Sequence, residues 1–139
     1  MVSHLNEIEP GLILYLDPAI LQEFGVRGPR WMRGVHPFVC LEVNGDQSAW
    51  AALSSSSLHG ARHRIDPAHK RGRTQSWLER DTFIYGCDYW YFGPSYAFQE
   101  ASRDTERSMP HKRNSVNPEG LEFIKAYVHY SMYQIGGAA

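Results

Sequence analysis

Polar side chains stand at the ends of two neighbouring apolar runs. His36 lies at the entrance of the run "GVHPFVCLEV" (34–43), and serines 54–57 close the run "SAWAALSSSS" (48–57). An imidazole can take or give a proton near neutral pH, and a hydroxyl can donate a hydrogen bond to an anionic oxygen. These ends would form one polar pocket if the two runs pair. The alternative is that they are ordinary surface residues where loops meet strands.

The elements that must position such a pocket are two strands and a tight turn. Pro37 is tolerated at the start of a strand, where its missing N–H breaks no ladder hydrogen bond. The connecting residues 44–47, "NGDQ", are a strong turn signal because Asn-Gly accepts positive φ. The sequence therefore predicts a hairpin that brings His36 and Ser54 into one neighbourhood.

A basic stretch follows the hairpin. Residues 62–80 contain two acids and six bases, on a chain whose formal net charge is -1. The six bases are Arg62, Arg64, Lys70, Arg71, Arg73 and Arg80. A local cluster of this kind suits a polyanion site better than general electrostatic coating does. The alternative is a solvated loop.

Length and composition predict a single domain, residues 1–139. Hydrophobic residues make up 42% of the chain and charged residues 21%, which is typical of globular proteins. No apolar run approaches the roughly 20 residues that span a bilayer. The first 26 residues contain no Lys or Arg, unlike a signal peptide, so we expect a cytoplasmic protein. His59 and His63 lack a third metal ligand, and we expect no metal and no cofactor.

The remaining pattern is mainly β. Strands are predicted at 11–18, 61–67 and 77–86, and a helical turn at 18–24 within a long loop. The aromatic segment 89–98 is interpreted as core or a dimer surface, with base stacking as the alternative. Asn117 and Pro118 begin a C-terminal helix of about 117–135. The total is five to six short strands and one C-terminal helix.

In this order, the motifs "GLILYLDP", "GVHPFVCLEV" and "SAWAALSSSS" resemble the MazF/PemK toxins, whose relatives share the fold of the gyrase poison CcdB. The resemblance implies a small SH3-like barrel, usually dimeric, that acts as a metal-independent endoribonuclease of a toxin-antitoxin system. In that family an Arg before the second-strand Pro and a hydroxyl ending the third strand form the catalytic pair. His36 and Ser54 stand at these two positions.

We interpret the chain as a toxin-like barrel that cleaves single-stranded RNA, and we assign the roles from the chemistry of the residues and the predicted hairpin. His36 would be the general acid or base, and Ser54 would stabilise charge. The substrate phosphates would be held by Ser55, Arg62, Arg64 and Arg73. The implied partners are the RNA, a neutralising antitoxin protein that fills the groove, and a second copy of the chain.

The sequence also departs from the family pattern. Glu9-Pro10 replaces an early basic residue, and His36 replaces the second-strand Arg. An arginine mainly stabilises charge whereas a histidine transfers protons, so the exchange changes the mechanism or ends it. The alternative function is a non-catalytic protein-binding module on the same barrel. That module would bind a gyrase-like target, an antitoxin or another partner through the aromatic segment or the 19–34 loop.

Overall fold

Eight strands form one sheet in the computed structural model, which describes residues 8–55, 63–103 and 113–130. The strands are β1 (Leu12–Leu16), β2 (His36–Asn44), β3 (Gln47–Ser54), β4 (His63–Arg64), β5 (Lys70–Arg71), β6 (Phe83–Ile84), β7 (Trp90–Pro94) and β8 (Asn114–Val116). The helices are α2 (Pro18–Glu23), α3 (Gln75–Glu79), α4 (Ser95–Ala101), α5 (Pro118–Tyr127) and the 3-10 turn η2 (Pro67–His69). The predicted class, a mainly β barrel-like fold with a C-terminal helix, is confirmed.

The predicted hairpin is confirmed as β2 and β3, the longest strands of the sheet. Asn44 pairs with Gln47 across the turn, and Gly45 adopts the positive φ of 64° that the Asn-Gly sequence predicts. A β-bulge between Cys40 and Glu42 shifts the register once along the hairpin. Bulges of this kind increase the local twist of a strand pair, which favours a curled sheet.

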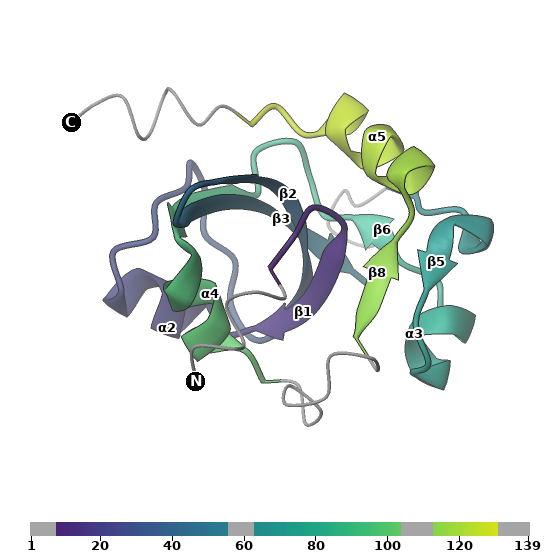
Figure 1. The fold of residues 1–139 in the computed structure, drawn as a ribbon, viewed down its shortest axis with the longest axis horizontal. Helices are drawn as coiled ribbons and strands as arrows, with labels where there is room; N and C mark the ends of the chain where they lie inside the picture. Colours follow the sequence, from purple (N-terminus) through teal and green to yellow (C-terminus); the bar gives the residue numbers. More distant parts are fainter. Residues whose placement is uncertain (1–7, 56–62, 104–112, 131–139) are drawn as a thin grey trace.

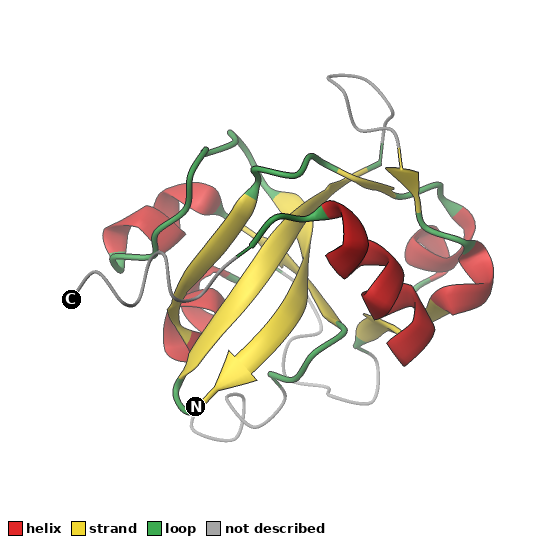
Figure 2. Ribbon diagram, turned by 90° about the horizontal axis from the view of Figure 1, so that it is seen from above, coloured by secondary structure: helices red, strands yellow, loops and turns green. Residues whose placement is uncertain are grey.

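Strand order places β3 in the interior of the sheet. The path runs β4-β6-β3-β2-β1-β8-β5, and β7 also pairs with β3 (Figure 1). In Figures 1 and 2, α2 and α4 lie on one side of the long strands, while α5 and α3 lie on the other. None of the described helices has the length and apolarity needed to cross a membrane.

Alternate residues of the long strands supply two separate cores, as the two-residue period of a strand requires. The first core, packed against α2 and α4, includes Leu14, Leu16, Phe38, Trp50, Ala52, Tyr91 and Phe98. The second core, packed against α3 and α5, includes Ile13, Val39, Ala51, Leu53, Trp77, Trp90 and Ile124. Both faces of β2 and β3 are therefore covered, which explains why these strands read as nearly continuous apolar runs.

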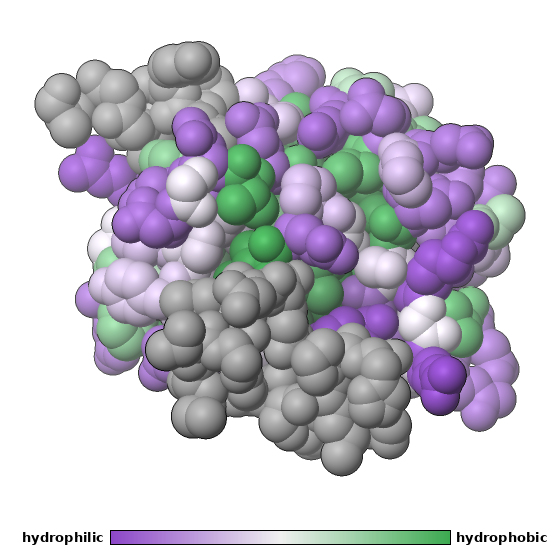
Figure 3. Space-filling model, viewed as in Figure 1, coloured by the Kyte–Doolittle hydropathy of each residue, from purple (hydrophilic) through white to green (hydrophobic). Residues whose placement is uncertain are grey.

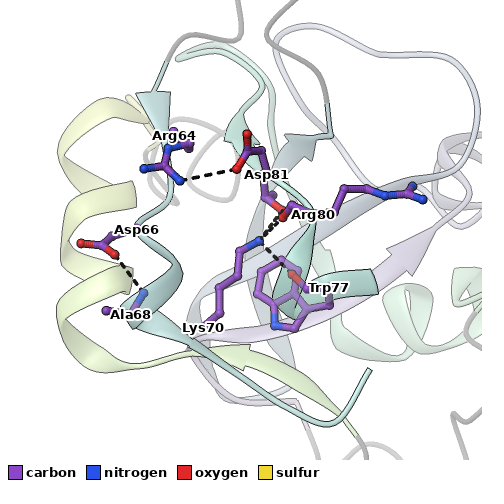
Figure 4. A network of polar contacts seen from close by, with 8 residues as sticks. Arg64, Asp66, Ala68, Lys70, Trp77, Arg80 and Asp81 are labelled. Atoms are coloured by element: carbon purple, nitrogen blue, oxygen red, sulfur yellow. Dashed lines mark hydrogen bonds and ion pairs between the residues drawn. The ribbon is translucent and has the colours of Figure 1, made fainter. Parts of the chain in front are cut away.

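A buried lysine joins the two ends of the strand path. Lys70 of β5 is 4% exposed and pairs with Val116 of β8, so its side chain lies on the face of the second core. Its ammonium donates to Trp77 O at 2.8 Å, Arg80 O at 2.6 Å and Thr82 Oγ1 at 2.9 Å (Figure 4). These acceptors lie just before β6, near the opposite end of the path. The ammonium thus helps to hold the curled sheet together.

The structure corrects the strand predicted at 77–86. Its first part is helical, because α3 buries Trp77 and allows its indole Nε1 to donate to Arg71 O at 2.9 Å. Only Phe83 and Ile84 form a strand. The helical turn also presents the carbonyls of Trp77 and Arg80 to the Lys70 ammonium.

Two further boundaries differ from the prediction. Of the strand expected at 61–67, residues 61 and 62 lie outside the described part, and the described residues form only β4 before Asp66 caps η2 by accepting from Ala68 N at 2.9 Å. The C-terminal helix begins at Pro118 as predicted but ends at Tyr127, not near 135; residues 131–135 lie outside the described part. The chain leaves the helix to bury Val128 and to let Tyr130 donate its hydroxyl to Glu42 Oε1 at 2.9 Å.

The Lys70 contacts predict a large loss of stability in the variant Lys70→Met. The methionine fills much of the same volume but leaves three acceptors without their donor, two of them buried contacts. Since an unsatisfied buried polar group costs roughly 1–3 kcal/mol, we expect the free energy of unfolding in urea to fall by about 2–4 kcal/mol.

A matched control is Lys125→Met on α5. The Lys125 ammonium lies 3.9 Å from Glu122 at the surface, where an ion pair contributes little, so we expect a change within about 0.5 kcal/mol. Equal stability of the Lys70→Met protein and the unaltered protein would show that the ammonium does not hold the sheet ends together.

Candidate functional site

His36 and Ser54 lie at the same end of the hairpin and on the same face. The register pairs Phe38 with Ala52, and His36 and Ser54 each stand two residues beyond that pair. Because side chains alternate along a strand, both face the side of the first core. His36 also pairs with Leu16 of β1, whose side chain is part of that core. The structure therefore brings the two predicted catalytic residues to one rim of the sheet.

The strand beside β3 is interrupted at this rim. β7 pairs with β3 as far as Ala51, and β6 resumes the ladder at Leu53. Opposite Ala52, residues 85–89 leave the ladder, and we call them the tyrosine bulge. Ala52 N donates to Tyr89 O at 3.0 Å, and Tyr85 N donates to Ala52 O at 3.1 Å. One residue of β3 thus fixes both ends of a five-residue excursion.

The tyrosine bulge places two half-buried rings beside His36. The ring of Tyr85 meets the imidazole edge to face, with centroids 5.5 Å apart and an interplanar angle of 89°. Tyr89 in turn contacts Tyr85 at 4.5 Å between centroids. The excursion thus builds an aromatic wall next to a potential base.

A hydrogen bond to the backbone orients the imidazole. His36 Nδ1 lies 3.0 Å from Gly34 O. A carbonyl oxygen can only accept, so this bond requires the proton to be on Nδ1. In the neutral ring, Nε2 then carries the lone pair and is the nitrogen able to accept a substrate proton. His36 is half-buried, so a ligand can reach the ring from solvent.

The loop that precedes His36 is firmly attached to β7. We call residues 27–33 the arginine loop. Arg27 and Phe92 exchange two backbone hydrogen bonds of 3.0 and 2.8 Å. Tyr91 donates its hydroxyl to Arg30 O at 2.8 Å, and burial raises the pKa of Tyr91, which keeps the donor protonated. Trp31 stacks on the Tyr91 ring at 4.4 Å.

A glycine allows this close approach. A Cβ at Gly28 would lie 2.4 Å from Cδ1 of Tyr91 and 2.5 Å from the carbonyl oxygen of Trp90. No other residue fits there without moving the backbone. The result is that the Arg30 guanidinium lies over the Tyr89 ring, 5.6 Å from its centroid. A continuous series of contacts therefore runs along this rim, from Arg30 through Tyr89 and Tyr85 to His36.

Arg64 shares the row of Ser54. Arg64 pairs with Phe83, and Phe83 pairs with Ser54, so the three side chains face the same side of the sheet. Two strand spacings separate Arg64 from Ser54, about 10 Å. The guanidinium lies 3.5 Å from the Asp81 carboxylate, and the two side chains are 49% and 61% exposed. Such an exposed pair is weak and easily exchanged for a phosphate.

The other predicted binding residues are less close to His36. Arg73 is exposed in the turn after β5, three strands from β2 along the sheet. The surface over β5 and α3 is mostly hydrophilic (Figure 3), which agrees with a solvated stretch. Ser55 is exposed, whereas Ser54 is only 8% exposed. Arg62, Ser56 and Ser57 lie outside the described residues.

The sequence reasoning missed the arginine loop and the tyrosine bulge. Arg27, Arg30 and Arg33 recur every three residues in a segment, 24–35, that contains no acid. That charge pattern was available as a signal. The positions of Tyr85 and Tyr89 had no local signal, because they depend on where the ladder along β3 breaks.

The core interpretation of the aromatic segment 89–98 is confirmed for most of its rings. Trp90, Tyr91 and Phe98 are buried, while Tyr96 is 47% exposed on α4. Within residues 8–55, 63–103 and 113–130, no group of three His, Cys, Asp or Glu side chains could hold a metal ion. No family model, no curated protein and no solved structure matches the chain. The resemblance to MazF/PemK toxins therefore stays a prediction.

The hydrogen bond of His36 predicts its tautomer. In alkaline solution, where the imidazole is neutral, we expect the proton on Nδ1 and the lone pair on Nε2. Nitrogen-15 correlation spectra of the histidine side chains distinguish the two tautomers directly. The exposed His129, whose ring has no hydrogen bond among the described residues, is the internal reference and should show no such preference. A proton found mainly on Nε2 of His36 would contradict the proposed orientation.

Proposed function

We propose that this protein is a metal-independent endoribonuclease that cleaves single-stranded RNA. The observation that carries the proposal is the setting of His36. Its Nδ1 is held by Gly34 O, and its Nε2 is left for a substrate. The ring stands next to Tyr85, and the Arg30 guanidinium lies over Tyr89, the next ring of the aromatic wall. Single-stranded RNA offers both unstacked bases and phosphates to such a surface.

The proposed step begins with proton transfer to His36. Nε2 accepts the proton of a ribose 2′-hydroxyl, and the 2′-oxygen bonds to the adjacent phosphorus. The bond from that phosphorus to the 5′-oxygen breaks, and this oxygen takes a proton from solvent. The products are a 2′,3′-cyclic phosphate and a 5′-hydroxyl end. The imidazolium then returns its proton to solvent.

Negative charge on the phosphate is stabilised by residues on the same face. Arg64 can exchange its exposed contact with Asp81 for a phosphate oxygen, which a guanidinium binds in a fork geometry. Ser54 ends β3 on this face and the exposed Ser55 follows it, and their hydroxyls are the proposed hydrogen-bond donors to the phosphate. In this arrangement the proton transfer and the charge stabilisation belong to different residues. The arginine of the family pattern would have supplied mainly the second function.

The resemblance adds three partners to the proposal. These are the RNA substrate, an antitoxin protein that covers the His36 rim, and a second copy of the chain. The rim suits an antitoxin because its exposed residues are accessible to a bound segment. Binding there would exclude the RNA and so inhibit cleavage.

The mechanism predicts the effect of replacing His36. With a long single-stranded RNA in EDTA, we expect His36→Gln to lower the cleavage rate by about 10²- to 10⁴-fold, because a general base is removed. The glutamine keeps a polar side chain of similar reach. Cleavage is followed by gel electrophoresis, and the ends are identified as 2′,3′-cyclic phosphates by their resistance to ligation until the ring is opened and the phosphate is removed.

His129→Gln is the matched control, because the His129 side chain is exposed and the substitution keeps the backbone N–H that donates to Cys87 O at 3.2 Å. It should cleave at the rate of the unaltered protein. Equal rates for the His36→Gln protein, or no cleavage by the unaltered protein, would reject the endoribonuclease.

A second candidate function is the non-catalytic protein-binding module. It is favoured by an exposed aromatic pair, Phe24 and Tyr96, which contact edge to face at 5.6 Å and are 37% and 47% exposed. A hollow of about 570 Å³ adjoins α2. It is lined by Asp17, Pro18, Ala19, Gln22, Glu23, Met32, Arg33 and Gly34. Trp90 and Tyr91 cannot serve this function directly, because both are buried.

A further inference from the structure

We propose that Arg30 and Trp31 of the arginine loop, together with Tyr89, form a subsite that binds one nucleotide of a single strand through its base and its phosphate. This inference deepens the proposed function, because it assigns substrate binding to residues 27–33 and not to the basic stretch 62–80. The subsite lies on the same rim as His36, at the other end of the series of contacts that Tyr85 and Tyr89 form.

The charge of the loop is the first argument. Arg27, Arg30 and Arg33 are all exposed, and the segment 24–35 contains no acid. Among the described residues no carboxylate forms an ion pair with any of the three, whereas Arg64 is paired with Asp81. Guanidinium groups without an internal counter-ion are the ones available to phosphates, whose contacts supply most of the salt-dependent affinity for nucleic acids.

The aromatic surface is the second argument. One face of the Trp31 indole is stacked on Tyr91, and Trp31, which packs against the first core, keeps part of its surface exposed. That exposed part is what a base can contact, and Arg30 is the preceding residue in the chain. An unstacked base can stack on an indole ring or on a guanidinium plane. A base in a duplex is already stacked, so the subsite selects single strands.

Rigidity is the third argument. The loop is held by the Arg27–Phe92 backbone pair, by the Tyr91 hydroxyl on Arg30 O, and by the close approach at Gly28. A site that is already ordered loses little conformational entropy when a ligand binds. Solvated loops usually lack such attachments. Here they hold the backbone that carries Arg30 and Trp31, and the stack on Tyr91 holds the indole.

The test is a binding measurement with a strand that cannot be cleaved. The probe is a fluorescein-labelled single-stranded 2′-O-methyl RNA, which has no free 2′-hydroxyl, and binding is followed by fluorescence anisotropy. We expect Arg30→Gln to weaken binding about tenfold and to reduce the slope of log K against log salt by about 1. Lys125→Gln on α5, on the other side of the sheet, is the control and should change neither quantity, while Arg73→Gln tests the competing basic stretch.

The base contact is tested separately with Trp31→Ala. We expect it to weaken binding of the strand about tenfold and to have little effect on binding of an abasic strand of the same length, because only the former offers a stacked base. Trp31→Phe keeps a ring against Tyr91 and should retain most of the affinity. The Trp31→Phe variant shows whether a loss of affinity in Trp31→Ala comes from altered packing against Tyr91. Thermal melting of both variants checks that they are folded.

The outcomes separate this inference from the proposed function. Loop-dependent binding by a protein that does not cleave RNA would support the subsite and reject the endoribonuclease. Cleavage with an unaltered KM in Arg30→Gln and Trp31→Ala would reject the subsite and leave the endoribonuclease standing. Tighter binding of a duplex than of the single strand, or a loss confined to Arg73→Gln, would also overturn the inference.

Discussion

Strand β3 has partners on both of its edges and side chains packed on both of its faces, and the site is built around it. Small residues make this possible, since Ala49 and Ala51 face the second core and Ala52 faces the first. Along one edge β3 pairs with β2, and along the other it pairs first with β7 and then with β6. The change of partner occurs at Ala52, where the tyrosine bulge leaves the ladder beside His36.

The rest of the fold keeps that strand in place. Lys70 connects β5 to the segment before β6 with three donated hydrogen bonds, so the two ends of the strand path are held near each other. Burial lowers the pKa of the Lys70 ammonium, while the nearby Asp81 carboxylate opposes this shift. The three acceptors explain why a charged group is tolerated there. The face of the curled sheet toward α5 is covered by the second core. His36 lies on the other face, at one end of the hairpin, and stays half-exposed.

The hairpin could be predicted from the sequence because its signals are local. The apolar runs, the Asn-Gly turn and Pro37 at the strand start together place His36 and Ser54 at one end of two paired strands. The strand predicted at 77–86 was wrong because Trp77 needs a helical turn to bury its indole, a requirement set by Arg71 and Lys70 elsewhere. The tyrosine bulge could not be predicted from the sequence for the same reason, since it depends on where the strands that pair with β3 change. The charge of the arginine loop was visible, but its attachment to Tyr91 was not.

The central claim is that substrate binds on the rim formed by His36, the tyrosine bulge and the arginine loop. The most direct test is backbone amide NMR of the labelled protein during titration with the uncleavable single-stranded RNA. We predict that the largest shift changes fall on residues 27–36 and 83–90, with α5 unaffected. Changes centred on residues 70–80, or on the exposed Phe24 and Tyr96, would contradict the account and favour a binding surface elsewhere on the protein.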